Sequence, residues 1–236
     1  GAFTCAQYKE GAQIYQKICD LGLDKDAPTF TTAVKLFAKL GRLEDVREVW
    51  SQAVATCPLN QALAAARIDA AASEGDVKTA AVVLDEMNKT GVAIDVMHIT
   101  SAMRACWSAE GQTHNAAKYL FQLALDLGLQ PDIALFTCLV GAFKAAPAAD
   151  IMGVYSDMRA RGIKPDFAFA ETYLTTLLLK PRAETWTLES AGRWLSTLPM
   201  DRISAAETAL KDFKSMRVTL TLLSAVIDRA IQQVTN

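Results

Sequence analysis

The stretches Gly128-Leu-Gln-Pro-Asp132 and Gly162-Ile-Lys-Pro-Asp166 carry the same short pattern, one after the other along the chain. A glycine followed four residues later by an aspartate also stands at residues 22–26 and 91–95, so the pattern returns in steps of about 35 residues. A fixed period of this length is typical of proteins built from stacked structural repeats. The pattern therefore decides the fold.

The glycine, proline and aspartate of the pattern each have a physical role. Glycine adopts the left-handed conformation that closes a helix, because it has no Cβ to clash, and this predicts a helix end at Gly128. Pro131 cannot continue a helix and pushes the residue before it into extended geometry. Asp132 then stands where its side chain caps the free amide groups of the next helix. Each repeat is predicted to end in a helix stop followed by a new helix.

Two helices are predicted inside each repeat. Between Gln61 and Asp95, apolar residues fall at helical spacing, the pattern breaks at Gly75-Asp76, and the spacing then resumes. Gly41 and Gly111 stand at the same place in the neighbouring repeats. A helical hairpin of this size cannot bury its apolar faces alone, so successive hairpins must stack. The predicted fold class is all-α, an α-solenoid of helix-turn-helix repeats of about 35 residues.

The turn glycines and terminal acids set the expected boundaries. The chain starts inside a repeat, and we therefore expect it to be a fragment of a longer solenoid. The expected segments are 1–26, the second half of a truncated repeat; 27–60, 61–95, 96–132 and 133–166, four repeats; 167–201, a degenerate repeat; and 202–236, a divergent helical hairpin or C-terminal cap.

Composition agrees with an all-helical protein and limits its chemistry. Hydrophobic residues make up 51% of the chain, and the five cysteines are far apart, which indicates reduced and mostly buried thiols. No apolar run approaches the roughly 20 residues that a membrane helix needs. His98 and His114 are the only histidines, and neither has a cysteine or carboxylate at the spacing of a metal site. We therefore expect no enzyme activity, no catalytic residue, no metal, no cofactor and no membrane insertion.

Several repeats share further residues in the same phase. They have an aromatic residue early in the first helix, a glycine at mid-repeat and an Ala-x-x-x-Phe-x-x-Met type of stripe in the second helix. The matching pieces are Thr29-Phe30-Thr31, Leu40-Gly41-Arg42-Leu43-Glu44-Asp45, Glu74-Gly75-Asp76, Leu84-Asp85-Glu86-Met87 and Ile163-Lys164-Pro165-Asp166. Over residues 6–200 the chain resembles the pentatricopeptide repeat family, whose fold is a right-handed α-solenoid. The tetratricopeptide repeat has a similar period but does not end in Gly-x-x-Pro-Asp.

The resemblance implies binding of single-stranded RNA, either mRNA or rRNA, with one base for each repeat. In the family, the fifth and last residues of a repeat face the base edge, Thr with Asn favours adenine, and Thr with Asp favours guanine. The implied pairs are Thr31 with Asn60, Ala65 with Asp95, Thr100 with Asp132, Thr137 with Asp166, and Glu171 with Asp201. Ala65 and Glu171 do not fit these rules, so the implied sequence is A-x-G-G from 5′ to 3′.

Two observations leave a structural alternative open for these residues. Aspartate, asparagine and threonine are also ordinary residues at helix starts, where they act as caps and no more. The second residue of each repeat, which in the family wedges between bases, is not the usual valine, and this predicts weaker stacking. These residues are Pro28, Ala62, Met97, Ala134 and Ala168.

Charge is the main objection to RNA binding, because the chain has a net charge of −2. The predicted first helices are nevertheless mildly basic and the second helices acidic. The expected contacts to the RNA backbone are Lys35, Lys39, Arg67, Arg104 and Lys144; Lys180 adds a further cation, and Asp69, Glu74 and Glu171 oppose them. The same face is equally consistent with a solvated helix surface.

Two functions follow from different classes. The first is an RNA-binding factor of mitochondria or chloroplasts that serves RNA processing, stabilisation or translation. The alternative is a non-catalytic scaffold subunit of a large organellar assembly, such as a mitochondrial ribosome, in which contacts with protein subunits dominate. The threonine and aspartate pairs favour the first function, whereas the acidic net charge favours the second.

Overall fold

The computed structural model describes residues 5–179 and 187–235, and every regular element in these ranges is a helix. The chain divides into two compact bodies, the N-terminal body Gly1–Ala109 and the C-terminal body Glu110–Asn236. None of the described helices combines the length and the apolar character that crossing a membrane requires. The helices of the N-terminal body are α1 (Cys5–Asp20), α2 (Ala27–Lys39), α3 (Leu43–Thr56), α4 (Gln61–Glu74), α5 (Val77–Thr90) and α6 (Val96–Ser108).

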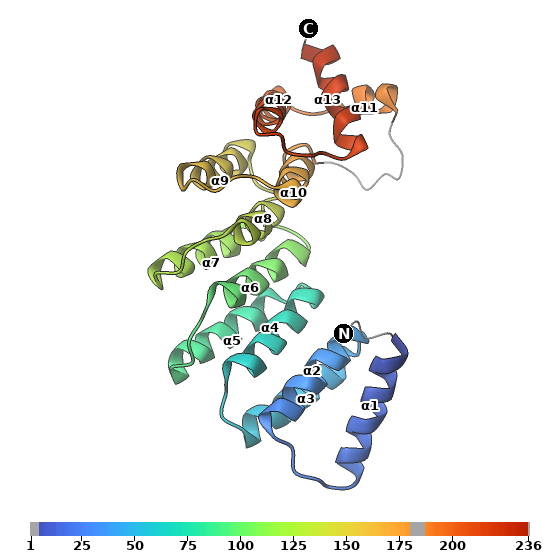
Figure 1. Cartoon of the computed structure of the whole chain (residues 1–236), viewed down its shortest axis with the longest axis vertical. Coiled ribbons are helices and arrows are strands. Elements are labelled where there is room, and N and C mark those ends of the chain that lie inside the picture. The colour runs from blue at the N-terminus through green and yellow to red at the C-terminus, as the bar shows by residue number, and fades with distance from the viewer. Residues whose placement is uncertain (1–4, 180–186, 236) are drawn as a thin grey trace. The chain divides into compact units, whose positions relative to one another are not determined.

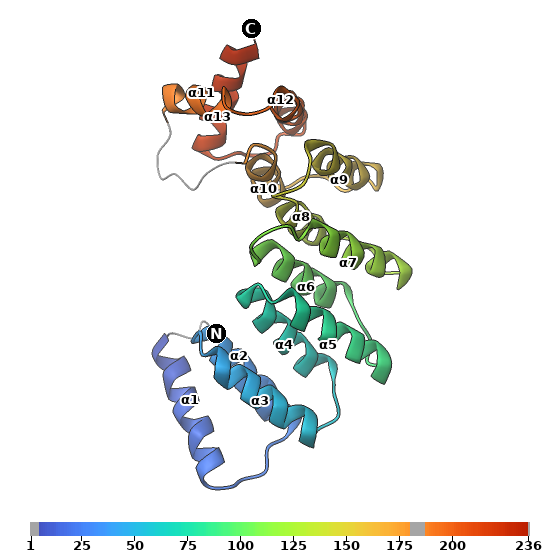
Figure 2. The same cartoon turned by 180° about the vertical axis from the view of Figure 1, so that it is seen from behind.

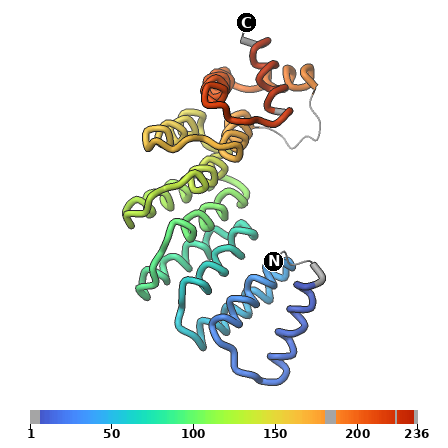
Figure 3. The backbone as a smooth tube through the Cα atoms, viewed as in Figure 1, coloured from blue at the N-terminus to red at the C-terminus, as the bar shows by residue number. Residues whose placement is uncertain are grey.

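The first helices of the repeats form one layer of the N-terminal body. Helices α2, α4 and α6 lie side by side, and α3 and α5 pack behind them as the second helices of their hairpins (Figures 1 and 2). Figure 3 shows the chain reversing direction between the two helices of each hairpin. The expected repeats 27–60 and 61–95 therefore each contain a pair of helices.

Small side chains allow the first helices to pack closely. Helix α4 presents alanines to its neighbours, and Ala64, Ala66, Ala70, Ala71 and Ala72 are all buried. Larger residues fill the space between the two layers, where Phe30 and Phe37 of α2 are buried. The rings of Tyr15 of α1 and Phe37 pack nearly at right angles, with their centroids 5.6 Å apart. The layer of first helices is thereby held at the surface as a continuous face.

The recurring glycine and aspartate act at helix ends as predicted. Gly22, Gly91, Gly128 and Gly162 all have left-handed φ angles, between 62° and 76°. Behind Gly128 the amide of Leu129 donates to the Ala124 carbonyl at 2.9 Å, which closes the helix. The Asp132 and Asp166 carboxylates each accept an amide of the next helix at 2.8 Å. The helix stop and the cap are both confirmed.

The C-terminal body continues the hairpins and then departs from them. Its helices are α7 (His114–Asp126), α8 (Ile133–Ala142), α9 (Ala148–Ala160), α10 (Phe167–Leu177), α11 (Leu188–Leu195), α12 (Met200–Ser215) and α13 (Leu222–Thr235). The position of the second helix behind α10 is taken by α12, which packs against both α9 and α10, whereas α11 packs against α13. Helix α11 thus lies in chain order between the two helices of one hairpin.

Aromatic rings and one buried arginine hold α12 in this place. The Phe213 ring lies 5.6 Å from Tyr155 of α9 and 6.2 Å from Tyr173 of α10. The Arg202 guanidinium donates to the carbonyls of Leu177 and Ala146, each at 2.7 Å. Because these carbonyls lie at the end of α10 and just before α9, one side chain joins three parts of the C-terminal body.

The repeat that starts at Phe167 consequently ends later than expected. The expected boundary at Asp201 falls in the first turn of α12. Arg217 has the left-handed φ of 59° that glycine has elsewhere, and the Val218 amide donates to the Phe213 carbonyl at 2.9 Å. Thr221 then caps α13 by accepting the Ser224 amide at 3.1 Å. We therefore assign the end of this repeat to Thr221.

Candidate functional site

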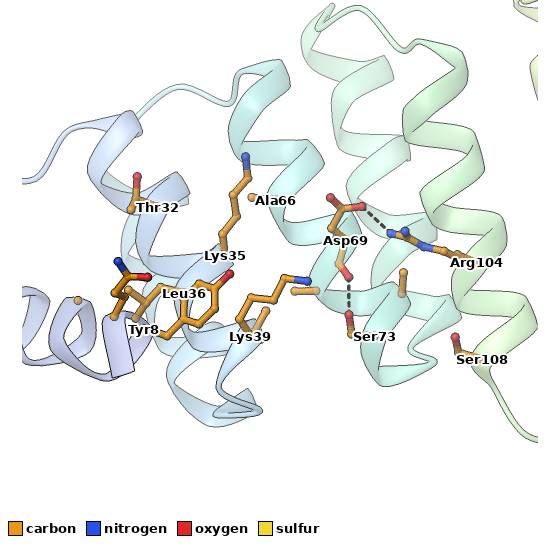
Figure 4. A pocket seen from close by; sticks show the side chains of 15 residues that line it. Tyr8, Thr32, Lys35, Leu36, Lys39, Ala66, Asp69, Ser73, Arg104 and Ser108 are labelled. Atoms are coloured by element: carbon orange, nitrogen blue, oxygen red, sulfur yellow. Dashed lines mark hydrogen bonds and ion pairs between the residues drawn. The ribbon is translucent and has the colours of Figure 1, made fainter. Parts of the chain in front are cut away.

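A hollow of about 830 Å³ lies on the first-helix face of the N-terminal body. Lys35 and Lys39 of α2 and Arg104 of α6 line it, together with Tyr8 of α1 (Figure 4). Lys35, Lys39 and Arg104 are exposed. Three of the expected backbone contacts are thus brought to one concave surface, whose floor is made of small apolar residues.

One carboxylate moderates the charge of this hollow. Asp69 of α4 accepts from Arg104 Nη2 at 2.9 Å and from Ser101 Oγ at 2.6 Å, both on α6. The Asp69 and Arg104 side chains are each about half exposed. Asp69 therefore orients Arg104 and offsets part of its charge. The sequence does carry a signal for this contact, because Asp69 and Arg104 occupy the same position in successive repeats.

Arg67 does not belong to this surface, which corrects the expected set of backbone contacts. Its side chain is only 4% exposed, and its Nη1 lies 3.6 Å from Oε1 of Glu74, which is also buried. Arg47 of α3 approaches the other oxygen of Glu74 at 3.6 Å. The charge of Arg67 is therefore paired in the interior, beside Glu74. The sequence did not predict this, because helical spacing alone does not distinguish the groove side of α4 from the side that faces α3.

Two further cations differ from expectation. Lys144 was expected on a first helix, but α8 ends at Ala142, and Lys144 is half-buried in the turn that follows. Lys180 lies outside the described residues.

The threonines at the fifth positions share one geometry. The hydroxyls of Thr31, Thr100 and Thr137 each donate to the carbonyl four residues earlier in their own helix, at 2.7, 2.8 and 2.7 Å. Each hydroxyl hydrogen is thus already used in a hydrogen bond within its own helix. Each threonine retains oxygen lone pairs that accept hydrogen bonds.

The residues at the last positions are exposed helix caps that use one oxygen. Asn60 Oδ1 accepts the Leu63 amide at 2.9 Å, as the Oδ1 atoms of Asp132 and Asp166 do for their own helices. Asp95 is engaged further, because its Oδ1 meets both the His98 amide at 3.0 Å and the His98 ring at 2.6 Å. Ala65, its expected partner, brings no polar side chain.

The fifth residue of the next repeat has a different partner from the expected one. Both oxygens of the Glu171 carboxylate accept hydrogen bonds from Thr221, whereas Asp201 stands exposed in α12. The expected pair of Glu171 with Asp201 is therefore not formed. The Glu171–Thr221 contact joins the fifth residue of a repeat to the helix cap that ends the same repeat.

The second residues of the repeats lie at the surface. Pro28, Ala62, Met97, Ala134 and Ala168 are all exposed, Met97 at 73%. Their exposure is compatible with a position that contacts a ligand.

The histidines and cysteines have structural surroundings. His98 is 4% exposed and completes a capping box with Asp95, and His114 begins α7 with its ring 6.1 Å from that of Phe143. Cys106 and Cys138 are buried cysteines outside any disulfide, and burial raises the pKa of the Cys106 thiol to about 11. Among the described residues, no group of histidine, cysteine and acidic side chains has the arrangement of a metal site.

Comparison with known proteins gives three results. No protein-family model matches the chain. A pentatricopeptide repeat-containing protein of Arabidopsis thaliana is 26% identical over 186 residues, which are 78% of this chain and 21% of that protein. The structure of the pentatricopeptide repeat protein PPR10 in complex with an 18-nt psaJ RNA element aligns with a TM-score of 0.63 over 98% of this chain and 32% of that chain, at 18% identity.

The chain has the fold of the pentatricopeptide-repeat solenoids. The structure of PPR10 from maize aligns equally well, with a TM-score of 0.63 over 96% of the chain at 13% identity. The chain spans about a fifth of the length of the Arabidopsis protein and about a third of PPR10. The expected all-α solenoid of helical hairpins is confirmed.

Proposed function

We propose that this pentatricopeptide-repeat chain binds single-stranded RNA along its first helices. The observation that carries the proposal is the shared fold with PPR10, a protein whose structure holds an RNA element, across nearly the whole of this chain. The hollow lined by Lys35, Lys39 and Arg104 supports it, because ribose-phosphate backbones are bound by exposed cations. These residues and Lys144 remain as the proposed backbone contacts.

The hydrogen-bonding groups left at the fifth and last positions support the base preferences. The hydroxyl groups of Thr100 and Thr137 already donate their hydrogens to carbonyls of their own helices. Asp132 and Asp166 are carboxylates, and each accepts an amide of the next helix. Both members of each pair therefore offer acceptors only. The Watson–Crick edge of guanine has two adjacent donors, N1–H and the N2 amino group, and so fits such a pair.

The first pair offers a different combination. Asn60 uses Oδ1 for its cap, so its Nδ2 amide remains as a donor beside the Thr31 oxygen. Adenine presents the complementary edge, with N1 accepting and the N6 amino group donating. Asp95 is engaged with His98, and the fifth position of its repeat holds Ala65, so that repeat has no comparable pair. The proposed RNA sequence is A-x-G-G.

The proposed role is non-catalytic. The chain would hold a short RNA segment in mitochondria or chloroplasts during RNA processing, stabilisation or translation, the setting implied by its resemblance to the family. Any catalytic step belongs to other chains or segments in this proposal.

A binding assay tests the proposal. The chain is titrated by fluorescence anisotropy with labelled oligonucleotides that differ only in carrying A-x-G-G or U-x-C-C. We expect A-x-G-G to bind at least about tenfold more tightly, since each mismatched base in a specific complex costs about 1–3 kcal/mol. Equal affinities that vanish together at moderate salt would falsify base reading.

One observation favours the scaffold as a second candidate function. The net charge of −2 is unusual for a protein whose partner is a polyanion. Acidic second helices would then face a protein subunit. Equal affinities in the same assay, together with co-purification of protein subunits of an organellar assembly, support this second candidate.

A further inference from the structure

The repeat from Phe167 to Thr221 differs from the others at its fifth and last residues, the two positions expected to contact a base. Thr221 stands in front of α13 as Asp166 stands in front of α10, since each side chain accepts an amide three residues later. Glu171 is the fifth residue after Asp166. Glu171 and Thr221 are therefore the fifth and last residues of this repeat, equivalent to Thr137 and Asp166 of the repeat before it.

In this repeat the two positions bind each other. Glu171 Oε1 accepts the Thr221 amide at 2.8 Å, and Oε2 accepts the Thr221 hydroxyl at 3.1 Å. The hydroxyl of Ser224, whose side chain is buried, also donates to Oε2 at 2.9 Å. Three donors from the start of α13 thus converge on one carboxylate.

These hydrogen bonds leave few donor or acceptor groups of Glu171 and Thr221 available to a base. Both oxygens of Glu171 are occupied, and the Thr221 hydroxyl donates to Glu171 while it accepts the Ser224 amide. A base that displaced Glu171 would leave the buried Ser224 hydroxyl and the Thr221 amide without their acceptor, which is unfavourable. By contrast, the Thr137 hydroxyl bonds only to its own helix, and Asp166 uses Oδ1 for its cap.

We propose that the bonded pair of Glu171 and Thr221 interrupts base reading. The repeat from Phe167 to Thr221 selects no base, and the nucleotide facing Thr137 and Asp166 is the last one selected ahead of it. This inference rests on the proposed function, because it concerns where the reading of RNA stops.

The first test uses the unchanged chain and four RNAs, A-x-G-G-N, in which N is A, C, G or U. We expect the four affinities to agree within about twofold, well below the effect of a mismatch at a selected position. A tenfold preference for any N would overturn the inference. If A-x-G-G itself is not preferred over U-x-C-C, the proposed function fails instead, so the two failures are distinguishable.

The second test rebuilds a reading pair. The double variant Glu171→Thr/Thr221→Asp removes the bonded carboxylate, supplies a hydroxyl that donates to the Phe167 carbonyl, and restores an acidic cap, with no change in net charge. We expect it to favour G over C at N by about tenfold while it retains A-x-G-G selectivity. The single variant Glu171→Thr is the matched control, since it removes the carboxylate without adding an acid, and we expect no such preference.

The variants are checked by far-UV circular dichroism before binding is measured. A folded double variant that keeps A-x-G-G selectivity and gains no preference at N overturns the inference. If the double variant does not fold, the four-RNA series with the unchanged chain decides alone.

Discussion

Arg104 of α6 and Asp69 of α4 form an ion pair between neighbouring first helices, with 2.9 Å between Nη2 and Oδ1. The pair lies at the edge of the hollow that also contains Lys35 and Lys39 (Figure 4). A cation paired with a carboxylate attracts phosphate less strongly than an unpaired one, because the carboxylate repels the same phosphate. In the proposed function, the charge available to RNA is therefore set by this contact as well as by the number of basic residues.

The first prediction concerns Asp69. We expect Asp69→Asn to raise RNA affinity several-fold and to steepen the dependence of log K on log salt by about 0.7, the value for one more phosphate contact on a single strand. Folding stability changes little, since exposed ion pairs contribute about 0–1 kcal/mol. Anisotropy titrations at four salt concentrations measure both quantities. The matched control is Asp85→Asn, which breaks the exposed pair with Lys89 on a second helix; an equal gain there would assign the effect to net charge alone.

The second prediction concerns the two lysines of α2. The double variant Lys35→Gln/Lys39→Gln removes two exposed cations from the hollow, so we expect weaker binding and a salt slope shallower by about 1.4. Base preference remains, because phosphate contacts carry no sequence information. Lys78→Gln/Lys89→Gln on α5 makes the same charge change on a second helix and serves as the control. An unchanged slope in the α2 variant would mean that phosphates do not run along this face.

The third prediction concerns Asp132. Asp132→Asn replaces an acceptor with a donor at the last position, as at Asn60, and moves the preference at the third base from G toward A, a change of about tenfold in the ratio of affinities. The variant stays folded, since asparagine caps helices about as well as aspartate. Competition binding with A-x-G-G and A-x-A-G measures the ratio. Asp76→Asn, at the cap of second helix α5, is the control and leaves the ratio unchanged; no shift in the Asp132 variant contradicts base contact there.

The fourth prediction concerns the buried pair of Arg67 and Glu74. Burial lowers the pKa of the Arg67 guanidinium, and the negative charge of Glu74 opposes this effect. We expect Glu74→Gln to destabilise the N-terminal body by about 3–5 kcal/mol, because it leaves a buried charge unpaired. Urea denaturation followed by circular dichroism measures the change.

Two variants complete this test. Glu44→Gln removes an exposed partner of Arg47 and is expected to alter stability by less than about 1 kcal/mol. Arg67→Met/Glu74→Leu removes both charges and is expected to be more stable than Glu74→Gln alone. If Glu74→Gln were as mild as Glu44→Gln, the pair would not be buried in solution as it is here.

The sequence by itself determined the local features of this protein. Helix ends, caps and hairpin turns depend on residues within about four positions of each other, and these interactions recur in several repeats. The period, the left-handed glycines and the caps at Asp132 and Asp166 were therefore predictable, and so was the solenoid that stacked hairpins must form. The fifth-position threonines follow from the resemblance to the pentatricopeptide repeat, whose register is counted from those caps.

Only the tertiary structure decided which side chains meet across repeats. The burial of Arg67 beside Glu74 and the place of α12 behind α10 depend on packing that helical spacing does not specify. The chain segment that includes α11 separates Glu171 from Thr221 in sequence. Arg217 and Thr221 stand where the repeats ending at Asp95, Asp132 and Asp166 have glycine and aspartate, so the repeat end was missed. The physical reason is that packing between helices selects one face and one neighbour, whereas a helical pattern defines only that such a face exists.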